Sequence, residues 1–171
     1  ISLPMVLLTT LLTPLAILAS YSIQERVKSY MILFLLLETG MLGVFLALDL
    51  LLFFVFWEVG LVPMYFLIAQ WGSKNRNYAA LKFVLYTMGG SLGLLLAIQL
   101  MGVAVGSFDL LELYQRWPEL NELSIPIGLS VSTVKAIAFW AFVVAFAIKV
   151  PVWPFHTSVS YTHLTLPTIY S

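Results

Sequence analysis

The stretch that decides the fold is residues 31–71, MILFLLLETGMLGVFLALDLLLFFVFWEVGLVPMYFLIAQW, which is apolar almost throughout. Its only charged or amide side chains are Glu38, Asp49, Glu58 and Gln70. A helix needs about 20 apolar residues to cross the hydrocarbon core of a bilayer, so this stretch has room for two such helices. Asp49 falls between the two halves, which predicts a tight turn there, with the carboxylate as its cap.

The rest of the chain has the same character. It is 61% hydrophobic and 9% charged, with a mean hydropathy of +1.01, whereas soluble domains contain about 25% charged residues. The short alternating segments of a membrane barrel are missing from the sequence. The composition therefore predicts an all-α polytopic membrane protein with about five transmembrane helices in one bundle over residues 1–157. The expected helices are 2–20, 31–48, 50–71, 79–105 and 127–150.

Charge and cysteine content exclude several kinds of partner. Eight basic residues balance eight acidic ones, so we expect no nucleic-acid partner. The sequence has no cysteine, which excludes disulfides and cysteine-ligated iron–sulfur clusters. His156 and His163 are the only imidazoles, and both lie near the C-terminal end. We expect no metal and no cofactor in this chain.

The basic residues predict how the chain is oriented in the membrane. The segments 21–30 and 72–78 lie on one side and contain Arg26, Lys28, Lys74 and Arg76. The other side has Arg116 alone. Because loops rich in Lys and Arg remain in the cytoplasm, the segments 21–30 and 72–78 are expected to be cytoplasmic.

Small residues recur at helical spacing in three of the expected helices. In membranes such rows allow helices to approach closely, although small residues are also simply common there. The row on the last helix includes a lysine, which predicts that this lysine faces the bundle and not the lipid. The three rows are Gly40, Gly43 and Ala47; Gly89, Gly93 and Ala97; and Ala138, Ala141, Ala145 and Lys149.

Glu58 and Lys149 are the main candidates for chemistry. Ionisable side chains are costly in hydrocarbon and usually mark an ion or proton route. Each precedes a proline, Pro63 or Pro151, and a proline leaves a helical carbonyl without its donor. A broken helix beside an ionisable group is typical of ion sites in transporters. Two other interpretations remain: a permanently paired glutamate that joins helices, and a lysine that extends to the interface.

Three further residues have weaker signals. Lys82 lies one turn into the helix expected at 79–105, either as a second member of a proton relay or as an anchor at the cytoplasmic surface. Glu38 lies deep in the helix expected at 31–48 and needs a partner that the sequence does not identify. Pro151 and Pro154 interrupt the last apolar stretch and predict a helix break near Pro151.

Several motifs together resemble a known family. They are FWEVGLVPMYFLI at 56–68, YAALKF at 78–83 and FAIKVP at 146–151, followed by PFHT at 154–157. These motifs are similar to the antiporter-like M chains (chain 4) of proton-pumping NADH:quinone oxidoreductase, complex I. The resemblance covers residues 1–157 and less than half of the family's length.

The resemblance implies a proton-translocating membrane subunit. It implies that Glu58 and Lys149 form a charge pair, that Lys82 lies on the cytoplasmic access path, and that His156 belongs to a broken seventh helix. The fold would be part of the first of two inverted repeats. NADH, FMN, iron–sulfur clusters and quinone would be bound by other subunits, and the partners would be other membrane subunits, protons and the bilayer.

The same resemblance implies a bacterial inner membrane as the location. Three alternatives stay open: a subunit of a multi-subunit sodium/proton antiporter, a membrane-bound hydrogenase module, and a scaffold that does not conduct protons. A gene neighbourhood that encodes quinone-site and cluster-bearing subunits would favour the respiratory complex.

The last residues differ from the rest of the chain. From Val159 the sequence reads VSYTHLTLPT, which resembles the conceptual translation of a transposase sequencing adapter. The family continues Trp-Leu-Pro-Asp-Ala-His after Thr157, where this sequence has Ser158. We therefore expect residues 158–171 to be an adapter-translation artefact without a domain or a function of their own.

Overall fold

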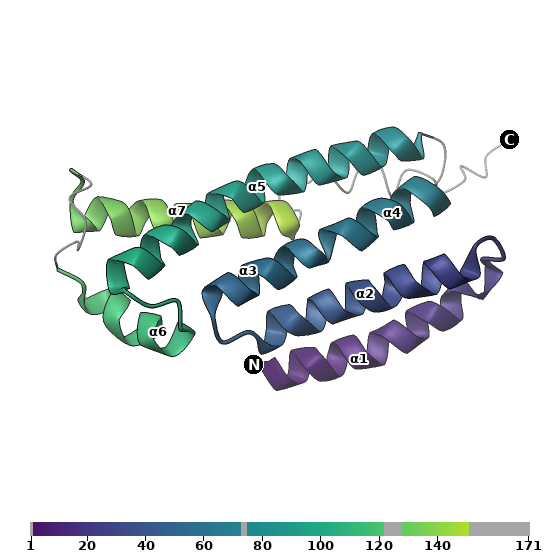
Figure 1. Ribbon diagram of the computed structural model, residues 1–171, viewed down its shortest axis with the longest axis horizontal. Helices are drawn as coiled ribbons and strands as arrows, with labels where there is room; N and C mark the ends of the chain where they lie inside the picture. Colours follow the sequence, from purple (N-terminus) through teal and green to yellow (C-terminus); the bar gives the residue numbers. More distant parts are fainter. Residues whose placement is uncertain (1, 73–74, 122–127, 151–171) are drawn as a thin grey trace, which may run out of the picture.

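The computed structural model describes residues 2–72, 75–121 and 128–150, which form helices joined by short connections (Figure 1). Their one β pairing is an isolated antiparallel bridge between Asp49 and Asp109. A 3₁₀ turn, Ser20–Ser22, follows the first helix. The helices are α1 (Ser2–Ala19), α2 (Val27–Leu46), α3 (Leu50–Val59), α4 (Leu61–Trp71), α5 (Arg76–Val105), α6 (Leu110–Glu119) and α7 (Val131–Lys149).

Five segments are long and apolar enough to cross a membrane, which agrees with the all-α polytopic prediction. They are α1, α2, α3 and α4 taken together, α5 and α7. The segments pack in chain order, α1 against α2, α2 against α3 and α4, α4 against α5, and α5 against α7 (Figure 1). The helix expected to begin at residue 31 begins at Val27. The proposed break near Pro151 lies outside the described residues.

The helix expected over 50–71 is interrupted at Gly60, where α3 ends and α4 begins. Pro63 has no N–H for the carbonyl of Val59, and its ring crowds that carbonyl, so the helical hydrogen bonding is lost here. The preceding bond, from the Gly60 N–H to the Phe56 carbonyl, is long at 3.4 Å. Pro63 itself is fully buried. The interruption therefore falls one turn before a packed proline, directly after Glu58.

A helix, α6, also occurs between the helices expected at 79–105 and 127–150, where none was predicted. Asp109 caps the N-terminus of α6, because its Oδ1 accepts hydrogen bonds from the Leu111 and Glu112 N–H groups at 2.8 and 3.1 Å. The helix buries Leu113 and exposes its charged residues. The apolar positions 110, 113, 114 and 117 recur at helical spacing, which is the pattern of an amphipathic helix.

Asp49 and Asp109 cap two helices that begin side by side. Asp49 Oδ1 accepts from the Leu51 and Leu52 N–H groups at 2.8 and 2.9 Å. Between the two caps, the Leu50 N–H donates to the Phe108 carbonyl at 2.9 Å and the Leu110 N–H donates to the Leu48 carbonyl at 2.8 Å. We call this pair of bonds the capped bridge. It joins the start of α3 to the start of α6.

The most deeply buried side chains lie between α5 and α7. Leu94 and Ile98 of α5 and Val134 of α7 are fully buried, and Ala138 and Ala145 are nearly so. The two alanines belong to the small-residue row predicted on the last helix. The prediction is confirmed for these two positions, whereas Lys149 at the end of the row is exposed.

The other two small-residue predictions had different outcomes. Gly40 lies where an added Cβ would be 3.1 Å from the backbone nitrogen of Gly60, and Gly43 lies against the Phe56 ring, so α2 and α3 do approach there. Around Gly89 and Gly93 there is open space, so that prediction was wrong for these two positions, whereas Ala97 of the same row is buried. The buried face of α5 includes Gly90, Leu94 and Ile98, and an added Cβ at Gly90 would meet the Ile148 side chain of α7.

Candidate functional site

Glu58 lies in the last turn of α3, directly before the interruption at Gly60. Its carboxylate oxygen Oε1 is buried and accepts no hydrogen bond from the described residues. A buried acceptor without a partner costs about 1–3 kcal/mol, and more when the group is charged. Native structures rarely leave such an atom without a water, an ion or a partner, so Glu58 is the first candidate for a functional residue.

Lys149 is the last residue of α7, and Glu58 is the charged group that acts on it electrostatically. Its ammonium does not bond Glu58 Oε1, which has no partner. Lys149 Nζ lies over the indole ring of Trp57, 4.9 Å from the ring centroid. A cation within about 6 Å of an aromatic centroid is attracted by the ring's negative face. The ammonium thus has an acid nearby and an aromatic surface beneath it.

The Trp57 ring is fixed on several sides. Its indole N–H donates to the Ser91 hydroxyl at 3.2 Å, and Ser91 is a buried residue of α5. The ring of Phe146 meets it edge-on with centroids 5.5 Å apart, and the Phe53 ring lies 5.6 Å away. Trp57 therefore joins α3, α5 and α7 at the point where the lysine lies.

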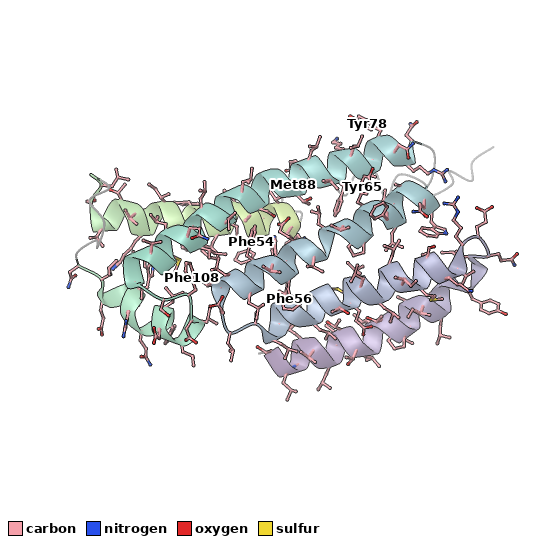
Figure 2. All side chains as sticks on the ribbon, in the orientation of Figure 1. Phe54, Phe56, Tyr65, Tyr78, Met88 and Phe108 are labelled. Atoms are coloured by element: carbon pink, nitrogen blue, oxygen red, sulfur yellow. The ribbon has the colours of Figure 1, made fainter. Side chains whose placement is uncertain are left out.

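A cavity of about 340 Å³ adjoins the site. Lys149 and Trp57 line it, together with Gly40 of α2, Gly60 and Phe83 of α5. Most of its wall is apolar. Figure 2 labels Phe56, another lining residue, between α3 and α2. The cavity has room for several waters beside the ammonium and the interrupted part of the α3–α4 span.

The structure brings together only some of the residues predicted for the site. Glu58 and Lys149 lie near each other, whereas Lys82 and Glu38, both half-buried, do not line the cavity. Pro151, Pro154 and His156 lie outside the described residues. Among the residues that the structure describes, no group of three or more His, Cys, Asp or Glu side chains could hold a metal ion.

Sequence reasoning missed two residues of this site. They are Trp57 and Ser91, neither of which was singled out as a candidate. The available signal was the position of Trp57 directly before the membrane glutamate. The partner Ser91 could not have been found, because a contact between residues 34 positions apart depends on how α3 and α5 pack.

Comparison with known proteins identifies the family. Residues 47–171 match the family described as "NADH:quinone oxidoreductase/Mrp antiporter, TM". The chain is 43% identical over 169 residues to NADH-quinone oxidoreductase subunit M of Rhodobacter capsulatus, covering 98% of this chain and 33% of that protein. It is 42% identical over 157 residues to NAD(P)H-quinone oxidoreductase chain 4 1 of Synechococcus, covering 92% of this chain and 28% of that protein.

A plant relative has a similar sequence identity. NAD(P)H-quinone oxidoreductase chain 4 of the Adiantum capillus-veneris chloroplast is 40% identical over 166 residues, covering 95% of this chain and 31% of that protein. The chain thus spans about a third of the length of the curated relatives it matches. The apolar helices and these matches make the chain an integral membrane protein, and it belongs to the NADH:quinone oxidoreductase/Mrp antiporter membrane family.

Proposed function

We propose that this chain is part of a proton-translocating membrane subunit of NADH:quinone oxidoreductase, and that Glu58 and Lys149 move the proton. The observation that carries the proposal is the buried, unbonded Oε1 of Glu58 close to a lysine ammonium. An acid that is only a structural partner would have its oxygens bonded. An acid that accepts and releases a proton needs an oxygen that is available.

The geometry fits a short proton route. The Lys149 ammonium is the positive charge that would approach Glu58 and move away from it. The cavity beside Lys149 has room for the waters that would connect this pair to the next group.

The energy for transport must come from outside this chain. Moving one proton across about 200 mV requires roughly 4.6 kcal/mol. In this proposal NADH, FMN, iron–sulfur clusters and quinone are bound by other subunits, and neighbouring membrane subunits transmit the change by shifting coupled protonation equilibria. The subunit is then a translocase component without a redox site of its own.

The other predicted residues belong to the ends of the route. Lys82 on α5 would take up protons from the cytoplasmic side, and Glu38 on α2 and His156 would act as relay or pairing groups. The orientation follows from the basic segments 21–30 and 72–78. The proposed location is the bacterial inner membrane.

Two substitutions test the proposal in the full-length protein within the assembled complex. Glu58→Gln removes the ionisable group with little change in size, and Lys149→Ala removes the ammonium. We expect both to abolish NADH-driven proton uptake into vesicles while the complex still assembles. Glu112→Gln, at an exposed acid of α6, is the matched control and should pump normally. Normal pumping by both site variants would favour a scaffold that does not conduct protons.

A second candidate is a subunit of a multi-subunit sodium/proton antiporter, because the description of the matching family includes Mrp antiporters. The two functions differ in what drives transport. A respiratory subunit moves protons only when NADH is oxidised. An antiporter moves them in response to a sodium gradient without NADH. Proton movement in vesicles that contain sodium but no NADH would favour the antiporter.

A further inference from the structure

The position of the Lys149 ammonium is the starting observation, and the inference rests on the proposed function. Nζ lies 4.9 Å from the Trp57 ring centroid, although Glu58 is close enough to act on it electrostatically. Glu58 Oε1, an oxygen to which an ammonium could bond, has no hydrogen-bond partner among the described residues. The lysine thus lies on an aromatic face and does not bond this oxygen of the acid that acts on it.

The geometry points to Trp57 as a positioning residue: its indole face is the second binding position of the Lys149 ammonium, occupied when the lysine is away from Glu58. Lysine then alternates between two defined places, the carboxylate and the ring. Its chain of four methylenes is flexible enough to move between them. No covalent bond forms or breaks in this movement. Only the position of the lysine side chain changes.

Ser91 fixes the orientation of the Trp57 ring. An indole that could rotate would offer its positive edge as often as its negative face, and the positive edge would repel a cation. The hydrogen bond from the indole N–H to the Ser91 hydroxyl holds the ring in one orientation. The neighbouring rings of Phe53 and Phe146 limit tilting from two sides. The face directed at Nζ is therefore defined by α5 and α7 as well as by α3.

The alternative is that Trp57 only fills space in the core. Its ring does pack against the cluster that includes Leu94 and Ile98. Packing depends on volume, whereas attraction of the ammonium depends on the electron density of the ring face. Substitutions that alter the electron density of the ring without its volume, or its volume without its aromatic face, therefore separate the two roles.

The first experiment compares Trp57→Phe with Trp57→Leu in the full-length subunit of the assembled complex, measuring protons taken up per NADH oxidised. Phenylalanine keeps an aromatic face and leucine does not. An aromatic–cation contact changes an equilibrium by roughly 2- to 30-fold. We expect Trp57→Leu to reduce the protons taken up per NADH by a factor in that range. Trp57→Phe should retain most of the pumping, and Ser91→Ala should lie between the two. Trp140→Leu, at an exposed tryptophan of α7, is the control.

The second experiment holds volume almost constant. Site-specific replacement of Trp57 by mono-, di- and trifluorotryptophan lowers the electron density of the face stepwise. We expect proton uptake per NADH to fall with each fluorine at Trp57 and to stay unchanged at Trp140. This series also decides the question if Trp57→Leu does not assemble.

Three results would overturn the inference: normal pumping by an assembled Trp57→Leu complex, equal losses in the Phe and Leu variants, or no response to fluorination. Each of these would occur while Glu58→Gln and Lys149→Ala still fail to pump. If instead those two variants pump normally, the proposed function itself fails. The two failures are therefore distinguishable.

Discussion

Two neighbouring membrane spans, α5 and the α3–α4 pair, differ in how much of each is buried and in whether the helix is continuous. The most apolar window of α5 has 39% of its residues buried, and the helix runs unbroken for 30 residues. The corresponding share for the α3–α4 span is 11%, and that span is interrupted at Gly60. The candidate acid Glu58 is on the second span. The candidate acid thus lies on the less buried span, next to one that is more deeply packed.

This difference has a physical basis. A group that gains and loses a proton needs space and a change of partners, and dense packing prevents both. Adjacent rigid packing is still required, because the ring beneath the lysine must keep its orientation. The α5 span supplies that support through Ser91. The following predictions disturb one span or the other in the full-length protein, and the expected effects decrease in order.

The largest effect is expected where α2 meets the interruption. In Gly40→Leu the Cβ would lie 3.1 Å from the Gly60 backbone nitrogen, and backbone cannot move aside as a side chain can. Overpacking of this kind costs about 1–3 kcal/mol. We expect a lower Tm in detergent and less assembled complex. Gly93→Leu, on a part of α5 with open space, is the control, and an equal loss there would contradict the prediction.

A smaller effect is expected at the end of α5. A side chain at Gly102 would overlap the ring of Phe108, which Figure 2 labels near the start of α6. In Gly102→Ala the ring can turn away, so we expect a loss of about 1 kcal/mol in the free energy of unfolding. Gly89→Ala should be neutral or slightly stabilising, since alanine is the better helix former. Thermal unfolding of the two variants checks this.

Loss of a helix cap should lower the free energy of unfolding by about as much as Gly102→Ala does. Asp49→Ala removes the acceptor for two N–H groups, and losses of about 1 kcal/mol are typical at such positions. Asp109→Ala should cost a similar amount. Because the capped bridge joins the two sites, we expect the double variant to differ from the sum of the single ones. Additive values in thermal unfolding would show that the bridge does not couple them.

The smallest effect on stability is expected at Pro63. Pro63→Ala returns a donor to the Val59 carbonyl, worth about 0.5–1.5 kcal/mol, and loses buried ring surface worth roughly as much. The Tm should therefore change little, while proton pumping should fall because the helix beside Glu58 becomes continuous. A variant that pumps normally would show that the interruption has no part in transport.

The sequence was sufficient for the class of fold and for the position of the acid and the lysine. Long apolar runs and isolated charges are strong local signals, so the five spans and Glu58 with Lys149 were visible in residue order alone. Helix α6 was missed because its charged residues suggested a loop, although Asp109 followed by apolar residues at 110, 113, 114 and 117 was an amphipathic helix with its cap. To recognise the helix, the spacing of its apolar residues had to be given more weight than its charged residues.

Contacts between helices were harder to predict. Gly40 and Gly89 both belong to rows of small residues, yet only Gly40 touches another helix. Which face of a membrane helix is buried depends on the shape of its neighbours, since lipid is as apolar as leucine and burial leaves no strong pattern. Ser91 was missed for the same reason. Its role arises only once α3 and α5 lie side by side.

The capped bridge has a geometric consequence for the acid. Two backbone hydrogen bonds hold the beginning of α3 to the beginning of α6, whereas the far end of α3 adjoins the interruption at Gly60. A helix fixed at one end can only swing about that end. Glu58 is nine residues along, about 14 Å from the pivot, so a tilt of a few degrees displaces its carboxylate by roughly an ångström. Tilting α3 would thus change the distance between Glu58 and Lys149 while Asp49 stays in place.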